Sequence, residues 1–429
     1  MKVVAIGIGS VMFGVNLLRD LFRTPELRGC ELWLVDIDSG ALGRMTRLAQ
    51  WLNAAAGWDA TVESTTDRCE ALPNADFVIT ATAVDRIRTW RIDHELCLRH
   101  GFPSVLSENG GPGGLSHTLR SVPLMLEIAQ DIERLAPAAL LFNYTNPENR
   151  VCLAISRHTG VRTIGLCHSV AEAIDRAARI LGRERATIDV GAAGVNHFTW
   201  FLSIRDVDDG RDLMPEYLER WDRADDGESR LGRLLFGTLG VAPAIDDDHV
   251  AEYLPWAADV LGSAGYDFDE HDRQARAATE QLQAWGAGTL PVEPLLAQPS
   301  PEALVDHSPA DIIADIATGK TRRRPSFIVP NGGLIDDLPA SAAVEVPGLV
   351  EDGVPRGVPS GRLPEPIATL VRHELTIQEL AVAAAVEGSR ELALQALLID
   401  PTVNSARAAG VFLDEILQAH RQYLPRFWS

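Results

Sequence analysis

The sequence predicts an α/β fold, in which an N-terminal doubly wound parallel sheet is followed by a C-terminal mixed α+β, helix-rich part. Two observations predict it. Over roughly the first 190 of the 429 residues, short apolar runs alternate with segments of helical periodicity, which is typical of βαβ units. Beyond there, longer helical segments replace this alternation. We therefore expect two domains, residues 1–190 and residues 191–429.

The first predicted unit is an apolar strand over 2–6, the turn Gly7-Ile8-Gly9-Ser10, a helix over 15–22 and a strand over 31–35. In such a Rossmann-like unit, bare backbone N–H groups and a helix N-terminus bind a pyrophosphate. Asp36 and Asp38 end the second strand, where a carboxylate accepts hydrogen bonds from a ribose diol, so NAD is favoured over NADP. Met12 stands where the usual third glycine falls, and the alternative is that the glycines only form a tight turn.

The other elements follow from the same apolar periodicity and from glycine and proline as breakers. In the first part we expect strands over 61–65, 76–82, 138–142 and 162–166, and helices over 40–56, 69–72, 93–100, 115–135 and 148–158, with a polar stretch at 85–91 and a glycine-dense turn at 107–114. In the second part we expect strands over 187–195, 198–205, 326–329 and 343–347. Residues 214–283 are mostly helical apart from 241–249, and residues from 364 onward form a largely buried helical layer.

Composition excludes some partners. A formal net charge of −21 disfavours nucleic acid and anionic membranes. No segment reads as a leader peptide or is long and apolar enough to cross a bilayer, so we expect a cytoplasmic protein. The cysteines are odd in number and lack a disulfide-framework spacing, which is typical of reduced thiols; they are Cys30, Cys69, Cys97, Cys152 and Cys167.

Polar groups fall at the ends of three predicted strands. Asn143 and Asn146 follow one, Cys167-His168 the next, and Asn196-His197 a third. Because ligands of parallel sheets bind at the carboxyl ends of the strands, we expect these groups to converge on one cleft.

Thiolate and neutral imidazole are both good transition-metal ligands, so Cys167 and His197 are a candidate metal pair. Two protein ligands are too few for a structural zinc site, and the open positions would serve substrate oxygens. The alternative is that Cys167 is a small buried apolar residue and His197 is merely hydrogen-bonded.

The run Asp246-Asp247-Asp248-His249 passes into an apolar stretch that contains Tyr253 and Trp256. Such a run is usually a solvated loop, and spacing alone favours Tyr253 as a core aromatic residue. The alternative is that one end of the run faces a pocket.

Six motifs occur together and in order along nearly the whole chain. They are Gly7-x-Gly9-Ser10, Asn143-Tyr144-Thr145-Asn146-Pro147, Gly165-Leu166-Cys167-His168-Ser169-Val170, Gly194-Val195-Asn196-His197, Glu252-Tyr253-Leu254-Pro255-Trp256 and Asn331-Gly332-Gly333-Leu334-Ile335-Asp336-Asp337-Leu338-Pro339. In this set the sequence resembles glycoside hydrolase family 4, the NAD- and divalent-metal-dependent glycosidases.

The resemblance implies hydrolysis without net redox change. In the family, hydride moves from sugar C3 to NAD, a base removes the C2 proton, and the metal stabilises the enediolate. The C1 leaving group is eliminated, water adds, and the hydride returns. The family metal is usually Mn²⁺, and because Mn²⁺ is hard for a thiolate, Co²⁺, Ni²⁺ or Fe²⁺ are alternatives.

The resemblance also implies residue roles. Cys167 and His197 would hold the metal, Tyr253 would be the C2 base, and Asp248 or His168 would protonate the leaving group. The residues implied for the cofactor are Gly7, Gly9, Ser10, Phe13, Asp36, Asp38, Thr82 and Asn143, and those implied for a small carbohydrate substrate are Arg86, Asn146 and Asn196.

Cys-His-Ser-Val resembles the α-galactosidases that act on unphosphorylated substrates, whereas other Cys-His members cleave α-glucosides or α-uronides. The segment 108–120 departs from the family galactosidases, which leaves the sugar open. The alternative functions are a plain NAD-dependent dehydrogenase and an inactive dinucleotide-binding regulator. The family also implies a homodimer or homotetramer, with the helical C-terminal half as the interface.

Overall fold

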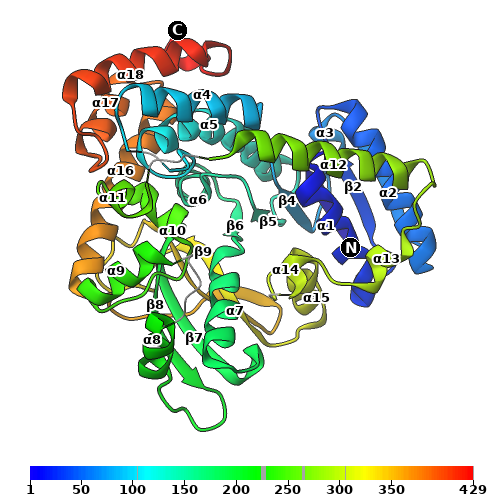
Figure 1. Ribbon diagram of the computed structural model, residues 1–429. Helices are drawn as coiled ribbons and strands as arrows, with labels where there is room; N and C mark the ends of the chain where they lie inside the picture. The colour runs from blue at the N-terminus through cyan, green and yellow to red at the C-terminus, as the bar shows by residue number, and fades with distance from the viewer. Residues whose placement is uncertain (104, 224–228, 263–265, 305, 429) are drawn as a thin grey trace.

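A computed structural model describes residues 1–103, 105–223, 229–262, 266–304 and 306–428. The described strands form one sheet of eleven, in the order β3-β2-β1-β4-β5-β6-β9-β10-β7-β8, with β11 beside β10 (Figure 1). The first six strands are parallel, which confirms the predicted doubly wound α/β fold; they are β1 (Lys2–Ile6), β2 (Glu31–Val35), β3 (Thr61–Thr65), β4 (Phe77–Thr80), β5 (Leu140–Asn143) and β6 (Arg162–Gly165).

Alternate side chains of β1 pack on helices at opposite faces of the sheet. Val3 and Ala5 join a core that contains residues of α1 (Val11–Arg23) and α2 (Ser39–Ala56). Val4 and Ile6 join a second core with residues of α5 and α6. Burial on both faces explains why these strands are apolar runs without polar alternation. The other helices of this part are α3 (Arg68–Ala71), α4 (Arg86–Arg99), α5 (Gly111–Leu135), α6 (Glu148–His158) and α7 (Ser169–Leu181).

The later strands extend the same sheet in antiparallel fashion. β9 pairs with β6 through Ile328 and Gly165, β10 pairs with β9, and β7 pairs with β10. The sheet therefore crosses the proposed boundary at residue 190, and the division into two domains stays a prediction. These strands are β7 (Ile188–Val195), β8 (Phe198–Asp206), β9 (Arg322–Pro330), β10 (Ala343–Glu351) and β11 (Val354–Gly357).

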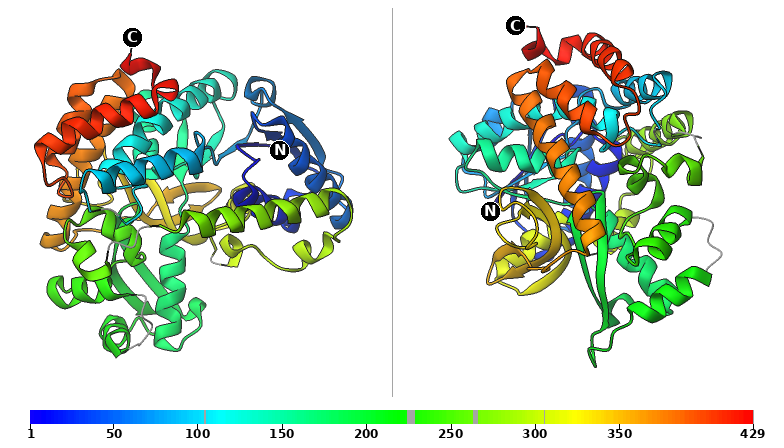
Figure 2. Two further views of the ribbon diagram at one scale, coloured as in Figure 1. Left: turned by 45° about the horizontal axis from the view of Figure 1, so that its top comes forward. Right: turned by 90° about the vertical axis from the view of Figure 1, so that its left-hand side faces the viewer.

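The C-terminal helices form the predicted buried layer. Residues of α16 (Glu365–Glu387), α17 (Arg390–Ile399) and α18 (Ala406–Ala419) share an apolar core with α4 and α5, at a distance from the N-terminal strands (Figure 2). The other helices are α8 (Met214–Arg223), α9 (Arg230–Leu239), α10 (Asp247–Val250), α11 (Ala257–Leu261), α12 (Phe268–Gly286), α13 (Glu293–Ala297), α14 (Pro301–Leu304) and α15 (Pro309–Thr318), with short 3₁₀ turns at Pro25–Leu27, Arg185–Thr187, Ala251–Tyr253, Arg421–Tyr423 and Pro425–Phe427. Within the described residues, no helix combines the length and hydropathy needed to span a bilayer.

Two local predictions are wrong. The polar stretch 85–91 is the first half of α4, and α5 begins at Gly111 inside the predicted turn. The α5 glycines are there for close packing, because a Cβ on Gly113 would lie 2.4 Å from the Cβ of Ser107. A composition rule that reads glycine as a helix breaker misses this reason. β11 was also not predicted.

Candidate active site

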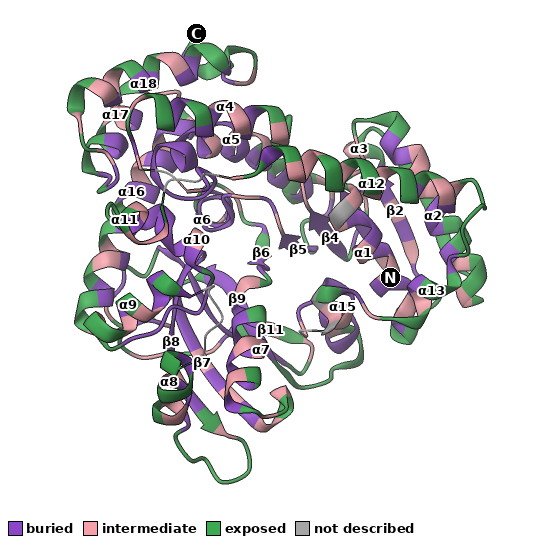
Figure 3. Ribbon diagram, viewed as in Figure 1, coloured by how far each residue is buried: buried purple, intermediate pink, exposed green. Residues whose placement is uncertain are grey.

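One cavity of about 1050 Å³ extends along the carboxyl ends of the parallel strands, at the upper end of the usual range for ligand pockets. Gly7 and Asp36 line one end, and Cys167 and His197 line the other. Helix α12 lies against α1 and α2 and contributes His271 and its neighbours to the wall. Figure 3 shows that the strands are largely buried and that exposed residues lie on the outer side of the surrounding helices.

The glycine turn is built for close approach. Gly7 has φ +83°, and a Cβ there would lie 2.4 Å from the carbonyl oxygen of Ala81. The N–H of Gly9 donates to Asp36 Oδ2 at 2.8 Å, and Ser10 caps α1. The bare turn and the start of α1 therefore face the cavity as a pyrophosphate site requires.

Replacing Gly7 with alanine is expected to destabilise the chain and to weaken NAD binding by at least about tenfold, because both the positive φ and the Ala81 carbonyl oppose a Cβ. Calorimetric titration with NAD⁺ and thermal melting measure the two effects. Gly43→Ala is the matched control, since Gly43 lies inside α2 and an added Cβ would meet only Arg47 Nη1 at 3.7 Å. A Gly7→Ala chain that binds NAD⁺ as tightly as the Gly43→Ala chain would contradict the assignment.

The two acids after β2 differ in their surroundings. Asp36 lines the cavity and also accepts from the N–H of Asp38 at 2.9 Å. Asp38 is exposed, and its Oδ1 accepts from the N–H groups of Gly40 and Ala41, which caps α2. The structure thus gives Asp38 a capping contact and brings only Asp36 to the cavity.

Cys167 and His197 come together at the other end. Cys167 Sγ lies 3.3 Å from His197 Nε2 and 3.2 Å from Ser169 Oγ. Both side chains are buried, and His197 has φ +63° at the turn between β7 and β8. β9 is antiparallel to both β6 and β10, and β7 is antiparallel to β10, so β7 runs opposite to the parallel strands. The contact between Cys167 and His197 therefore arises from this turn and not from the end of a third parallel strand, as predicted.

The electrostatics of the pair favour a neutral imidazole and, without a metal, a protonated thiol. Burial, with the charge of His249, holds the pKa of His197 well below its usual value, so the ring is neutral. Burial, with the carboxyls of Glu148 and Glu345, raises the pKa of the Cys167 thiol. In the described part of the chain, no three His, Cys, Asp or Glu side chains gather around one point, so the pair would leave most metal positions open.

His249 adds a cation beside the pair. Its ring centroid lies 4.5 Å from that of His197, and its Nδ1 lies 2.8 Å from Asp248 Oδ1. Burial opposes the charged ring, but the Asp248 hydrogen bond and charge outweigh burial and raise the pKa of His249 to about 9. His249 lines the cavity, whereas its partner Asp248 does not. His168 also lines the cavity, with an exposed side chain 3.9 Å from Glu172.

The remaining predicted residues divide into two groups. Phe13, Thr82, Arg86 and Asn146 line the cavity, and Phe13 packs on Tyr144 at 4.8 Å between ring centroids. Asn143 and Asn196 lie outside the lining and bond within the protein. Asn143 Nδ2 donates to Thr145 O at 3.1 Å, and the Asn196 N–H donates to Asn149 Oδ1 at 3.3 Å.

Tyr253 is also outside the lining. It is 6% exposed and packs on Phe198 with ring centroids 4.7 Å apart. Burial, followed by the carboxyls of Glu374 and Glu252, raises the pKa of its phenol well above the usual value. Cys167 also contributes to this shift, so Tyr253 is a buried aromatic residue close to one member of the candidate metal pair.

Glu108 and His117 line the cavity and were not predicted as site residues. Glu108 Oε1 lies 2.7 Å from the Arg86 guanidinium. Burial opposes the Glu108 charge, but Arg86 and the neighbouring histidines outweigh it and lower the pKa of the carboxyl. The sequence feature that could have indicated them is the difference between segment 108–120 and the family galactosidases. This difference does not show which of its side chains point into the cavity.

Glu252 holds the segment that carries Glu108. Its carboxyl accepts from the N–H of Glu108 at 2.5 Å and from that of Asn109 at 3.1 Å. Gly110 packs directly on it, since a Cβ there would lie 2.7 Å from the Glu252 carbonyl oxygen. Residues 108–110 and the turn Ala251–Tyr253 are therefore fixed to each other.

Glu252 is expected to make the apo chain less stable as pH rises. Burial raises the pKa of Glu252 to about 8 from 4.5, although the Glu108 N–H and His249 lower it. Between these values the folded chain holds a proton that the unfolded chain lacks, so the contribution of Glu252 to stability is fully present below pH 4.5 and is lost as the pH rises to 8. Glu252→Gln keeps an acceptor oxygen but does not titrate. In this variant the loss of unfolding free energy between pH 4.5 and pH 8 should be smaller by about 1–3 kcal/mol.

Thermal melting at pH 5 and pH 8 checks this expectation. The melting temperature of Glu252→Gln minus that of the wild type should be greater at pH 8 than at pH 5. Glu63→Gln, on an exposed edge-strand residue, is the control and should melt in parallel with the wild type. Equal pH dependence of the wild type and Glu252→Gln would show that this carboxyl is not the cause.

A parallel sheet in the order 3-2-1-4-5-6, with a glycine turn at a cavity, defines a Rossmann-type dinucleotide-binding protein. The comparisons with known proteins place it more closely. Residues 2–183 match the family 4 glycosyl hydrolases, and residues 192–403 match the family 4 glycosyl hydrolase C-terminal domain. The chain belongs to this family.

Its relatives differ in the sugar they act on. The chain is 30% identical to an α-galactosidase of Bacillus subtilis (strain 168), over 99% of both chains. It is 29% identical to an α-glucosidase of Erwinia rhapontici, over 99% of this chain and 98% of that one. A solved 6-phospho-α-glucosidase from gut microorganisms, in complex with NAD and Mn²⁺, has the same fold with a TM-score of 0.84 and 22% identity, over 99% of both chains.

Proposed function

We propose that this chain is an NAD- and Mn²⁺-dependent glycosidase that hydrolyses unphosphorylated α-glycosides, with an α-galactoside favoured. The observation that carries the proposal is the Cys167–His197 contact of 3.3 Å in the same cavity as the Gly7 turn. A plain dehydrogenase needs the turn but has no use for the pair. Family relatives with bound NAD and Mn²⁺ support the cofactors.

The residues present fit both groups. Gly7 has no side chain, and a Cβ there would collide with its neighbours, so the backbone is accessible to a dinucleotide. Cys167 and the neutral His197 provide a thiol and an imidazole, which suit a divalent transition metal. When bound, NAD supplies a hydride acceptor for sugar C3, and the metal supplies a Lewis acid that makes the C2 proton acidic. The Gly7 turn and the Cys167–His197 pair, which would hold the two groups, line the same cavity.

The chain's own residues would do the following. Tyr253 takes the C2 proton, and Asp248 or His168 donates a proton to the leaving-group oxygen. The buried Oδ1 of Asn146 has no hydrogen-bond partner among the described residues, so it is free to accept from a sugar hydroxyl. Helix α12 lines one wall of the cavity.

The proposal of an α-galactoside is supported by the Cys167-His168-Ser169-Val170 motif and by the similarity to the α-galactosidase of B. subtilis. The α-glucosidase of E. rhapontici is almost as similar, so an α-glucoside is the alternative, followed by an α-uronide.

A drop-out assay tests the proposal. Chelator-stripped enzyme is given an aryl α-galactoside, α-glucoside or α-glucuronide, with NAD⁺, Mn²⁺ and a thiol reductant omitted in turn. We expect aglycone release only with NAD⁺ and Mn²⁺ both present, without NADH accumulation, and deuterium at C2 of the sugar released in D₂O. NADH accumulation without aglycone would identify a dehydrogenase, and binding of both cofactors without turnover of any glycoside would overturn the proposed substrates.

We also propose that the protein is cytoplasmic and assembles as a homodimer or homotetramer through its C-terminal helices. Leu398, Val411 and Trp428 of that layer are exposed apolar residues, each at least 39% exposed. Light scattering of the purified protein tests the assembly, and a monomer would contradict it.

A further inference from the structure

The turn between β7 and β8 carries His197, and buried polar groups of other elements hold this turn. The backbone N–H of Asn196 donates to Asn149 Oδ1 at 3.3 Å. The side chains of Asn196 and Thr199 donate to Glu345 Oε2 at 3.5 Å and 2.8 Å. The four side chains that make these contacts are each at most 3% exposed, so the contacts lie inside the protein.

His197 depends on such contacts because of its backbone conformation. Its φ of +63° lies in the left-handed region, which residues with a side chain rarely adopt. A conformation of this kind persists only where the surrounding structure determines it. Since His197 Nε2 lies 3.3 Å from Cys167 Sγ, a return of the backbone to negative φ would turn the imidazole away from the thiol.

The amide of Asn149, in the first turn of α6, has its orientation fixed by its other partners. Its Nδ2 donates to Gln378 Oε1 at 2.6 Å and to the carbonyl oxygen of Ala343 at 3.1 Å. Gln378 is itself oriented, because its Nε2 donates to Glu374 Oε1 at 3.0 Å. With both donors of its amide engaged in this way, Asn149 presents its oxygen to the Asn196 N–H. Helix α16 therefore orients Asn149, and Asn149 orients the turn.

We infer that Asn149 is a positioning residue of the metal site, whose amide holds the backbone of Asn196 and thereby keeps His197 directed at Cys167. The inference rests on the proposed function, in which Cys167 and His197 hold a divalent metal. Asn149 lies outside the cavity lining, so it acts through His197 and not by contact with NAD or the sugar. A residue that orients a metal ligand in this way sets the affinity for the metal.

Two substitutions weaken this hold in different places. Asn149→Ala removes the acceptor of the Asn196 N–H, while Glu345 still holds the side chains of Asn196 and Thr199 and keeps the turn attached. Gln378→Ala leaves Asn149 in place and removes one of the two acceptors that orient its amide. Because Gln378 also lies outside the cavity lining, its effect on the metal has to pass through Asn149.

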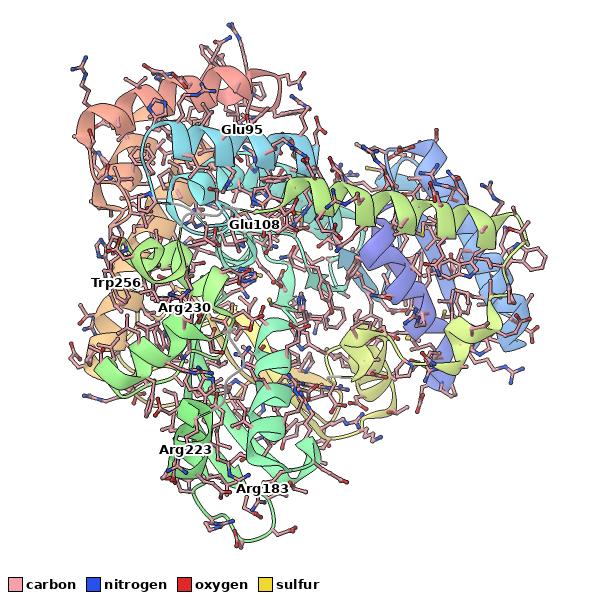
Figure 4. All side chains as sticks on the ribbon, in the orientation of Figure 1. Glu95, Glu108, Arg183, Arg223, Arg230 and Trp256 are labelled. Atoms are coloured by element: carbon pink, nitrogen blue, oxygen red, sulfur yellow. The ribbon has the colours of Figure 1, made fainter. Side chains whose placement is uncertain are left out.

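Two control variants separate this effect from general ones. Asn53 on α2 makes the same kind of contacts as Asn149, since its Oδ1 accepts from the Ala60 N–H at 3.3 Å and its Nδ2 donates to Ala60 O at 2.9 Å. Asn53→Ala is therefore the matched control. Exposed carboxylates bind Mn²⁺ weakly, and Glu95→Gln controls for this, since Glu95 is exposed on α4, away from the cavity-lining Glu108 (Figure 4).

The experiment titrates the NAD-loaded, chelator-stripped chain with Mn²⁺ and measures free Mn²⁺ by electron paramagnetic resonance. We expect Asn149→Ala to raise the dissociation constant of Mn²⁺ by about 10- to 100-fold, with unchanged NAD⁺ affinity. Gln378→Ala should raise it less, and the double variant should bind no more weakly than Asn149→Ala alone, because both act through one amide. Excess Mn²⁺ should restore kcat, and both controls should bind Mn²⁺ as the wild type does.

The outcomes separate this inference from the proposed function. If the wild type binds Mn²⁺ and Asn149→Ala binds it equally well, Asn149 does not position His197, and the proposed function stands. If Asn53→Ala weakens Mn²⁺ binding as much as Asn149→Ala does, the effect is one of general stability and the inference is overturned. If Asn149→Ala does not fold, wild-type Mn²⁺ affinity in Gln378→Ala overturns it. If the wild type binds no Mn²⁺, the proposed function fails and the inference fails with it.

Discussion

Cys167→Ser is expected to reduce kcat by at least about 10³-fold and to weaken Mn²⁺ binding, while NAD⁺ binding is retained. A serine hydroxyl stays protonated at neutral pH and is a far weaker ligand than a thiolate, so the metal would lose one of its two protein ligands. The loss follows because a metal supplies several kcal/mol of stabilisation to the charge that develops at C2. Steady-state kinetics and titration of free Mn²⁺ by electron paramagnetic resonance measure the two effects.

Cys69→Ser is the matched control, since Cys69 lines the same cavity after β3 and would report a general effect of losing a thiol. It should retain wild-type Mn²⁺ affinity. If Cys167→Ser also retained wild-type turnover and metal affinity, the pair would be a hydrogen-bonded contact in the core, as the alternative interpretation of the sequence holds.

The parallel sheet was predictable because its signals are local. Buried strands flanked by helices leave apolar runs at regular spacing, and the Gly7 turn and the Asp36 carboxylate lie within one βαβ unit. The sequence predicted that Cys167 and His197 come together, but the reasoning behind this prediction was incomplete. Their residue types suggested a metal, but the antiparallel β7 brings His197 to the site by a turn with φ +63°, which no periodicity reveals.

Long-range contacts account for what the sequence did not reveal. Glu108 enters the cavity because Glu252, 144 positions away, holds its backbone. Asp38 looks equivalent to Asp36 in the sequence, but it caps α2 in the structure. Such roles depend on which partners the fold brings together, and a single sequence without these contacts does not distinguish them.

Tyr253→Phe is expected to lower kcat by about 10²- to 10⁴-fold without changing NAD⁺ or Mn²⁺ affinity, and to abolish deuterium incorporation at C2 in D₂O. The physical reason is specific to this phenol. Burial and the Glu374 carboxyl raise its pKa, so it can act as a base only if the positive charge of a metal beside Cys167 offsets them. The phenylalanine variant keeps the packing on Phe198 and removes only the hydroxyl.

The competing base is Asp248, whose carboxylate would accept the proton through its hydrogen-bonded partner His249, because His249 lines the cavity and Tyr253 does not. Asp248→Asn is therefore measured in parallel. If Tyr253→Phe loses C2 exchange and Asp248→Asn keeps it while losing turnover on substrates with poor leaving groups, Tyr253 is the base and Asp248 serves the leaving group. If Tyr253→Phe retains exchange and Asp248→Asn loses it, the base lies in the His249–Asp248 pair, and Tyr253 is a core residue.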